Sequence, residues 1–209
     1  MLTRRRLLAL ALCLPALAAC RSRPKHAALP AGSTVLALGD SLTYGYGAPA
    51  ASAYPEQLAA MTGWKVINGG VSGDTSAQAL ARLPALMKQH APALVLTGIG
   101  GNDFLRKIPE AQTRADIGGI LQTLQAASVP SVLIAEPRLS LGALVGSPSD
   151  HPLYAELAEQ YRVPLLAGAW ADILGDKGLK SDQIHANAAG YRVFAEKMRD
   201  FLREQGFYR

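Results

Sequence analysis

Four short polar segments of the sequence carry side chains that together can catalyse acyl transfer. They are Gly39-Asp40-Ser41-Leu42, Ser72-Gly73, Gly101-Asn102-Asp103 and Asp182-Gln183-Ile184-His185. A serine nucleophile needs a base to take its proton, an acid to orient that base, and donors for the oxyanion that forms. Ser41, His185 and Asp182 suit the first three roles, because imidazole titrates near neutral pH and a carboxylate three residues away can hold its tautomer.

The same segments offer three hydrogen-bond donors for the oxyanion. These are the backbone N–H groups of Ser41 and Gly73 and the side-chain amide of Asn102. Gly73 suits this role because a residue without Cβ lets its N–H approach a ligand closely. Each segment alone also has a simpler interpretation as a turn, a helix cap or a surface pair, so it is their combination that favours catalysis. Five further polar residues are interpreted as mainly structural: Asp40, Asn68, Ser72, Asp74 and Asp103.

The remaining histidines and cysteines offer no competing site. The chain has four histidines, and only His185 combines a nearby acid with a loop position. Both cysteines, Cys13 and Cys20, lie in the first twenty residues. The sequence therefore predicts neither a zinc site nor a disulfide in the domain that follows.

Short apolar runs and longer stretches of helical periodicity alternate along the chain. The apolar runs, predicted as strands, are Thr34–Leu38, Trp64–Ile67, Leu94–Gly98, Ser131–Ala135 and Val163–Leu166. The predicted helices are Tyr54–Met61, Ser76–Gln89, Thr113–Ala127, Pro152–Tyr161 and Asn187–Glu204, with caps at Asp74 or Thr75, at Ser149 or Asp150, and at Asn187. This alternation predicts an open parallel sheet with helices on both faces. Ligands of such sheets bind beyond the carboxyl ends of the strands, where three of the four polar segments lie.

The first twenty residues have the pattern of an export signal. Arg4–Arg6 precede the apolar run Leu7–Leu17, which is too short to span a membrane. The ending Leu-Ala-Ala-Cys20 resembles the lipobox of bacterial lipoproteins and predicts lipidation of Cys20, with an ordinary cleaved signal as the alternative. Residues 21–32 are predicted to be a tether and residues 33–209 one domain. We expect an exported protein, either lipid-anchored in the bacterial envelope with the outer membrane favoured, or periplasmic; the Sec and twin-arginine routes both stay open.

The charge balance gives no indication of a nucleic-acid partner. The chain has 21 Lys and Arg against 16 Asp and Glu, and removing Arg4–Arg6 leaves 18 basic residues. Nucleic-acid binders usually present clustered basic faces, whereas these basic residues are scattered among acids. The length and half-apolar composition suit one globular domain, which we expect to be a monomer.

In their order and spacing the polar segments resemble the four blocks of the SGNH, or GDSL, hydrolase family. The likeness covers almost all of residues 33–209, and "GGVSGDTSAQALARLPALMKQH" and "GGNDFLR" resemble the bacterial thioesterase, arylesterase and lysophospholipase group. The resemblance implies a flavodoxin-like three-layer αβα fold with a five-stranded parallel sheet. It implies Ser41 as nucleophile, Asp182 and His185 as its partners, and Ser41, Gly73 and Asn102 as the oxyanion hole. It also implies hydrolysis of small-molecule or lipid esters and thioesters through an acyl-enzyme, without a cofactor.

Two departures from the family pattern limit what the resemblance says about the substrate. Ala186 stands where the family usually has proline. The segment Pro137–Tyr154 does not resemble the tyrosine-containing segment that follows the fourth strand in the thioesterase, arylesterase and lysophospholipase group. The leucines in Arg138–Pro148 can form an apolar lip or pack into the core. Two other functions stay open: deacetylation of cell-envelope glycans, and a non-enzymatic flavodoxin-like protein that binds phosphate at Gly39–Gly47.

Overall fold

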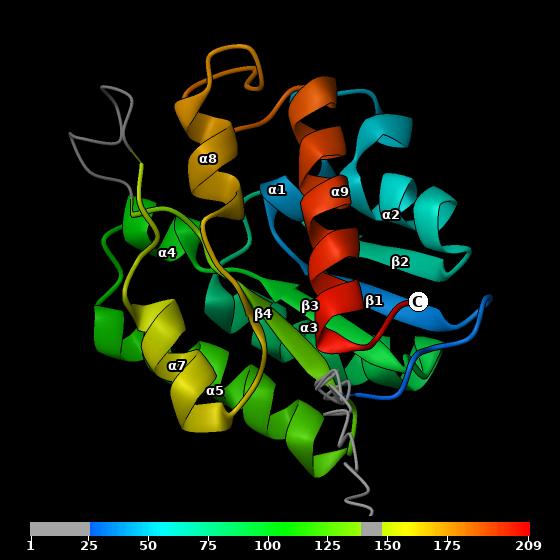
Figure 1. Cartoon of the computed structure of the whole chain (residues 1–209). Helices are drawn as coiled ribbons and strands as arrows, with labels where there is room; N and C mark the ends of the chain where they lie inside the picture. Colours follow the sequence, from blue (N-terminus) through cyan, green and yellow to red (C-terminus); the bar gives the residue numbers. More distant parts are fainter. Residues whose placement is uncertain (1–25, 139–147) are drawn as a thin grey trace, which may run out of the picture.

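The computed structural model describes residues 26–138 and 148–209, and the strands of this part form one parallel sheet (Figure 1). The strands are β1 (Thr34–Gly39), β2 (Lys65–Gly70), β3 (Leu94–Gly98), β4 (Ser131–Ile134) and β5 (Leu165–Leu166). Their order is β2-β1-β3-β4-β5 and every neighbouring pair is parallel. This flavodoxin-like order confirms the predicted fold class. Because the strand order reverses between β1 and β3, ligands are expected beyond the carboxyl ends of these two strands.

The side chains of β1 show how the sheet is buried on both faces. Val35 and Ala37 belong to one core layer and Leu36 and Leu38 to the other, and all four are fully buried. Successive residues of a strand point to opposite faces, so a strand covered on both sides must be apolar throughout. This is why the strand appears in the sequence as a continuous apolar run.

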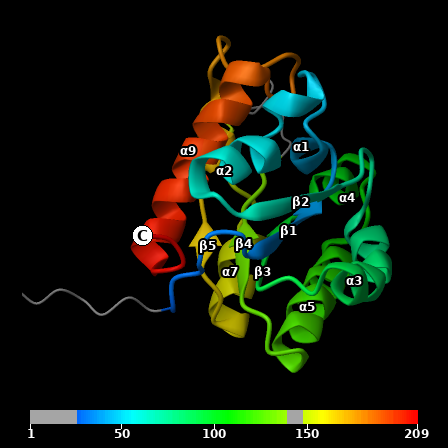
Figure 2. The ribbon, with the colours of Figure 1, turned by 90° about the vertical axis from the view of Figure 1, so that its right-hand side faces the viewer.

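Helices cover both faces of the sheet and complete three layers (Figure 2). One layer contains α2 (Tyr54–Thr62), α8 (Ala169–Gly175) and α9 (Ala188–Gln205), and the other contains α3 (Ser76–His90), α5 (Glu110–Ala126) and α7 (Leu153–Tyr161). Two short helices, α1 (Ser41–Tyr44) and α4 (Gly101–Leu105), follow β1 and β3 directly, and a 3-10 turn, η1 (Ala50–Ser52), precedes α2. Helix α1 carries Ser41, and α4 carries Asn102.

The predicted helix caps are confirmed at two helices and wrong at a third. Thr75 accepts from the N–H of Gln78 in a capping box at α3, and Asn187 caps α9. Helix α7 instead begins after Pro152, with no side-chain cap. Asp150 Oδ2 accepts the N–H of Gly168 at 2.6 Å. Asp150 thus contacts the backbone of a residue distant in sequence and does not cap α7.

Part of the predicted tether lies against the domain. The Leu29 N–H donates to the Phe207 carbonyl at 2.9 Å, and the Gly32 N–H donates to the Gly63 carbonyl at 2.8 Å. The predicted signal peptide, Cys20 and the leucines of the predicted lip lie outside the described residues. Within the described part, no helix has the length and hydropathy that crossing a bilayer requires.

Candidate active site

Ser41 is presented by a tight turn from β1 into α1. Asp40 caps this helix, because its Oδ1 accepts the N–H of Leu42 at 3.0 Å. A Cβ on Gly39 would collide with the Thr43 side chain, so glycine lets the first turn of α1 fold directly over the end of the strand. The turn places the Ser41 side chain on the wall of a pocket.

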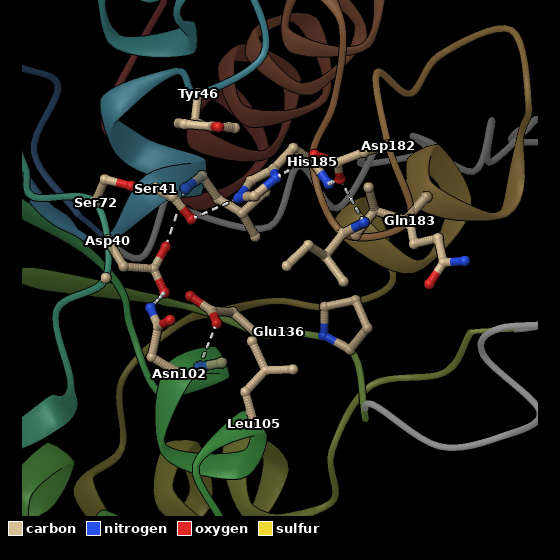
Figure 3. A pocket seen from close by; sticks show the side chains of 16 residues that line it. Asp40, Ser41, Tyr46, Ser72, Asn102, Leu105, Glu136, Asp182, Gln183 and His185 are labelled. Atoms are coloured by element: carbon tan, nitrogen blue, oxygen red, sulfur yellow. Dashed lines mark hydrogen bonds and ion pairs between the residues drawn. The ribbon is translucent and has the colours of Figure 1, made fainter.

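Ser41, His185 and Asp182 form a continuous chain of hydrogen bonds (Figure 3). His185 Nε2 lies 3.0 Å from Ser41 Oγ, and His185 Nδ1 lies 2.7 Å from Asp182 Oδ2. Burial raises the pKa of Asp182, but hydrogen bonds from His185 and from the N–H of Ile184 outweigh it and bring the pKa below its usual value. Asp182 is therefore ionised at neutral pH. With the Nδ1 proton held by Asp182, Nε2 is free to accept the Ser41 proton.

The loop that carries His185 is held by backbone pairing, although alanine replaces the family's proline. Ala186 is fully buried and pairs with Lys180 across an antiparallel bridge. The Ser181 N–H donates to the His185 carbonyl at 2.9 Å, and the Ser181 hydroxyl donates to the Ala186 carbonyl at 3.2 Å. These contacts restrain the turn without the ring of a proline.

The three predicted oxyanion donors line the same pocket as the triad. Gly73 has a φ of +87°, in the left-handed region that favours glycine. Asn102, on α4, donates from Nδ2 to Asp40 Oδ2 at 3.2 Å and to the Asp74 carbonyl at 3.0 Å. The structure thus brings together Ser41, Gly73, Asn102, Asp182 and His185. Cys20, the predicted lipidation site, lies outside the described residues.

Asp103 and Asp74, two of the polar residues interpreted as structural, form contacts between segments around the site. The fully buried Asp103 accepts the N–H of Ser76 at 2.9 Å and bonds the hydroxyl groups of Ser76 and Thr113, which joins α4 to α3 and α5. Asp74 pairs with Arg82 at 2.7 Å. These contacts fix the segments on either side of Asn102.

The pocket above the carboxyl ends of the strands has a volume of about 870 Å³. Besides the five predicted site residues, it is lined by Asp40, Leu42, Tyr46, Ser72, Gly101, Leu105, Glu136, Pro137, Leu174, Gln183 and Ile184. A volume of this size is typical of sites for small organic ligands. In the described part of the chain, no three His, Cys, Asp or Glu side chains are grouped to hold a metal ion.

Tyr46 and Glu136 line the pocket and were not among the predicted site residues. The Tyr46 ring lies against His185, with ring centroids 4.5 Å apart and planes tilted by 44°. The Glu136 side chain lies beneath Ser41 and is 1% exposed. A usable signal was present for Glu136, because it directly follows the predicted strand Ser131–Ala135, as the other site residues follow theirs.

Two carboxyls at the pocket floor differ sharply from Asp182. Burial raises the pKa of Asp40 to about 7, with the charges of Asp103 and Asp74 adding to it and the hydrogen bonds to Leu42 and Asn102 opposing it. Burial raises the pKa of Glu136 well above its usual range as well, and the charge of Asp40 adds to this effect.

The sequence matches a known protein family. Residues 37–193 match the family model described as GDSL-like lipase/acylhydrolase. The chain belongs to this family. A relative in Escherichia coli K12, thioesterase 1/protease 1/lysophospholipase L1, is 38% identical over 176 residues, which cover 80% of this chain and 82% of the relative. An arylesterase of Vibrio mimicus is 36% identical over 147 residues, covering 67% of this chain and 72% of the relative.

Solved structures of GDSL hydrolases and esterases share the fold. The psychrotrophic esterase EstA of Pseudoalteromonas, in a structure inhibited by monoethylphosphonate, matches with a TM-score of 0.71 and 26% identity over 82% of this chain and 97% of the other. A structure of TesA matches with a TM-score of 0.72 and 27% identity over 83% of this chain and 99% of the other. As a GDSL hydrolase, this chain is an ester-bond hydrolase, and the non-enzymatic phosphate-binding hypothesis is wrong.

The raised pKa values of Asp40 and Glu136 predict a pH-dependent folding stability. Both carboxyls bind protons more tightly in the folded chain, so their contribution to stability is full below about pH 4, the unfolded pKa. The contribution of Asp40 is lost as the pH rises through about 7, and that of Glu136 is lost as the pH rises toward its own raised pKa. An amide has no proton to lose. We therefore expect the free energy of unfolding of Glu136→Gln, measured relative to that of the unsubstituted protein, to be higher at about pH 8 than at about pH 5.

Urea unfolding of both proteins at the two pH values measures this difference. His151, whose pKa burial lowers, acts in the opposite direction but is common to both proteins and cancels. A difference between the proteins that is the same at both pH values contradicts the prediction.

Proposed function

We propose that Ser41, His185 and Asp182 are the catalytic triad of an esterase and thioesterase that acts through an acyl-enzyme. The observation that carries this proposal is the hydrogen-bond chain from Ser41 Oγ through His185 to Asp182 at the wall of the pocket. A hydroxyl nucleophile needs this order of contacts, because the base must be oriented as well as close.

The proposed reaction has two steps that use the same base. Ser41 Oγ attacks the carbonyl carbon while His185 Nε2 takes its proton, and the carbon–oxygen or carbon–sulfur bond to the leaving group then breaks as His185 returns the proton to that group. Water attacks the acyl-enzyme, again losing its proton to His185. The carboxylic acid leaves and Ser41 Oγ regains its proton. Asp182 stabilises the imidazolium in both steps.

The proposed oxyanion hole combines two backbone donors and one side chain. Ser41 is the first residue of α1, and the N–H groups of a first helical turn have no partner inside the helix. The Gly73 N–H and the Asn102 amide come from the loop after β2 and from α4. The carboxyl ends of the central strands bring these donors to one edge of the sheet.

The proposed substrates are acyl esters and thioesters, lipid esters among them. The relatives are named as a thioesterase, a lysophospholipase and an arylesterase. The walls of the pocket include the apolar side chains of Leu42, Leu105, Pro137, Leu174 and Ile184. Apolar walls favour an acyl chain, because each buried methylene contributes about 0.8 kcal/mol.

Replacing Ser41 by alanine should abolish the covalent enzyme. We expect the unsubstituted protein to gain the mass of one alkylphosphonyl group from a p-nitrophenyl alkylphosphonate, and Ser41→Ala to gain none, since no hydroxyl remains to attack phosphorus. Intact mass spectrometry measures this. Ser33→Ala, a change just before β1 and outside the pocket, is the matched control and should label normally. Labelling of Ser41→Ala at the normal rate would show that Ser41 is not the nucleophile.

The apolar walls predict a preference for longer acyl chains. We expect kcat/KM for p-nitrophenyl octanoate to exceed that for the acetate by about 10-fold or more, from the methylenes buried. Leu105→Ala should reduce kcat/KM for octanoate more than for acetate, because Leu105 lines the pocket and does not belong to the triad. Equal losses on both esters contradict this.

Faster release of acetate from acetylated glycans than from any acyl ester favours the alternative function, deacetylation of cell-envelope glycans.

We also propose that the chain is exported and carries a lipid on Cys20. Support comes from Arg4–Arg6, the apolar run that follows and the lipobox-like ending at Cys20. Cells fed alkynyl palmitate should yield labelled protein in the membrane fraction, and Cys20→Ser should lose the label. Cys13→Ser is the matched control and should keep it. An unlabelled unsubstituted protein in the periplasmic extract contradicts lipidation and favours an ordinary cleaved signal.

A further inference from the structure

Two carboxyls are buried together at the floor of the pocket, beneath Ser41. Asp40 follows β1 and is 2% exposed, and Glu136 follows β4 and is 1% exposed. Figure 3 shows the Glu136 carboxyl pointing toward Asp40 and the Asn102 amide. No Lys, Arg or His of residues 26–138 and 148–209 forms an ion pair with either carboxyl. The proposed triad does not use this pair.

The four oxygens of the pair have unequal hydrogen bonding. Asp40 Oδ1 accepts the N–H of Leu42 at 3.0 Å, and Asp40 Oδ2 accepts from Asn102 Nδ2 at 3.2 Å. Glu136 Oε2 accepts the N–H of Gly101 at 2.6 Å. The other oxygen of Glu136, Oε1, is buried and has no hydrogen-bond partner in the described part of the chain.

The absence of a side chain on Gly101 lets both carboxyls approach the start of α4. A Cβ on Gly101 would lie 2.5 Å from Glu136 Oε2 and 3.7 Å from Asp40 Oδ2. Glu136 therefore contacts the backbone of the residue before Asn102, while Asp40 contacts the Asn102 side chain. Anything that holds this pair in place also holds Asn102.

The pair must retain a proton, and Glu136 is the residue that carries it. Two carboxyls buried side by side do not both ionise, because two adjacent negative charges away from water have a high free energy. Asp40 has two hydrogen-bond donors to stabilise its charge and Glu136 has one. Burial and the charge of Asp40 raise the pKa of Glu136 well above its usual range, whereas the pKa of Asp40 is about 7. When Glu136 Oε1 is protonated, this buried oxygen can donate a hydrogen bond.

Asn102 poses a problem that this proton can solve. Its amide has two hydrogens, and they are directed to Asp40 Oδ2 and to the Asp74 carbonyl. An oxyanion donor must turn one hydrogen toward the substrate. Turning it away from Asp40 takes a donor from a buried carboxylate oxygen, which costs most of that group's desolvation penalty.

We propose that Glu136 is a positioning residue of the oxyanion hole, donating from its carboxylic acid Oε1 to Asp40 Oδ2 so that the Asn102 amide is released to the substrate oxyanion. This inference rests on the proposed function, because it assumes that Asn102 binds the oxyanion. Glu136 touches no reacting atom. It acts by replacing the hydrogen bond that Asp40 gives up when Asn102 turns.

The surroundings of the pair favour the form in which it retains a proton. The titratable groups that face it from the neighbouring elements are Asp74, Asp103, Tyr54, Tyr154 and Tyr191, with His185 and Asp182 across the pocket. The carboxylates among them disfavour a second negative charge. When the pair does lose its proton, Asp40 again competes for the Asn102 hydrogen. The rate of acyl transfer should therefore fall at alkaline pH.

The decisive comparison is between Glu136→Gln and Glu136→Met in the full chain. The glutamine amide reproduces the neutral acid, because its oxygen accepts from Gly101 and its nitrogen donates to Asp40. We expect Glu136→Gln to keep kcat within about 3-fold and to lose the alkaline fall, while Glu136→Met lowers kcat by about 10-fold or more at similar KM, as for a group that acts only in the transition state. A p-nitrophenyl ester reports both kcat and KM across the pH range.

A second measurement locates the proton directly and does not depend on activity. The infrared spectrum of the unsubstituted protein at pH about 8 should contain a carbonyl band of a protonated carboxylic acid, because burial and the charge of Asp40 raise the pKa of Glu136, and Glu136→Gln should lack this band. Circular dichroism and the melting temperature show whether each variant folds. If Glu136→Met does not fold, the pH profile and the infrared band of Glu136→Gln still decide.

Three results would overturn the inference: equal loss of kcat in Glu136→Gln and Glu136→Met, a fall of kcat at alkaline pH that persists in Glu136→Gln, or an infrared band of a protonated carboxylic acid that remains in Glu136→Gln.

Asn102→Ala separates this inference from the proposed function. A loss of about 100-fold in kcat is expected for a true oxyanion donor. If Asn102→Ala keeps full kcat, the proposed oxyanion hole is wrong; if it loses kcat while Glu136→Met does not, only the role of Glu136 is wrong.

Discussion

The buried carboxyl of Asp40 is the interaction on which the geometry of the active site depends. One oxygen bonds the N–H of Leu42 in α1 and the other bonds the Asn102 amide, so a single side chain joins the loops after β1 and β3. Because the carboxyl is buried, leaving one oxygen unsatisfied costs about 1–3 kcal/mol or more. The proposed nucleophile Ser41 and the proposed donor Asn102 are therefore held in a fixed relation to each other, as electrostatic stabilisation of an oxyanion requires.

Close packing at the strand ends makes this arrangement possible. A Cβ on Gly39 would collide with Thr43, and one on Gly70 would collide with the backbone of Tyr44. Glycine at the ends of β1 and β2 thus lets α1 lie directly over both strands. With a larger residue at either position the helix would have to shift, and Ser41 would move away from His185, whose position is set by a different part of the chain.

The carboxyls around the pocket have two kinds of environment, and their roles divide accordingly. Asp182 is partly exposed and accepts three hydrogen bonds within its own turn, so it stays ionised and can stabilise the imidazolium of His185. Asp40 and Glu136 are buried next to each other and together retain a proton. One fold thus holds a charged carboxylate and a neutral carboxylic acid within the same pocket, because burial and hydrogen bonding separate their pKa values.

The sequence alone predicted the long helices, all five strands and five residues of the candidate site, since apolar periodicity and residue type after a strand are local properties. It did not predict α1, α4 or α8, whose four to seven residues are too short for a periodic signal. The cap expected at Ser149 or Asp150 was wrong, because α7 begins after Pro152 and Asp150 Oδ2 bonds the distant Gly168 instead. The positions of Glu136 beside Asp40 and of Tyr46 beside His185 follow from the tertiary structure and not from any local pattern. Strand order and burial bring these side chains together, and both arise from contacts between residues far apart in the chain.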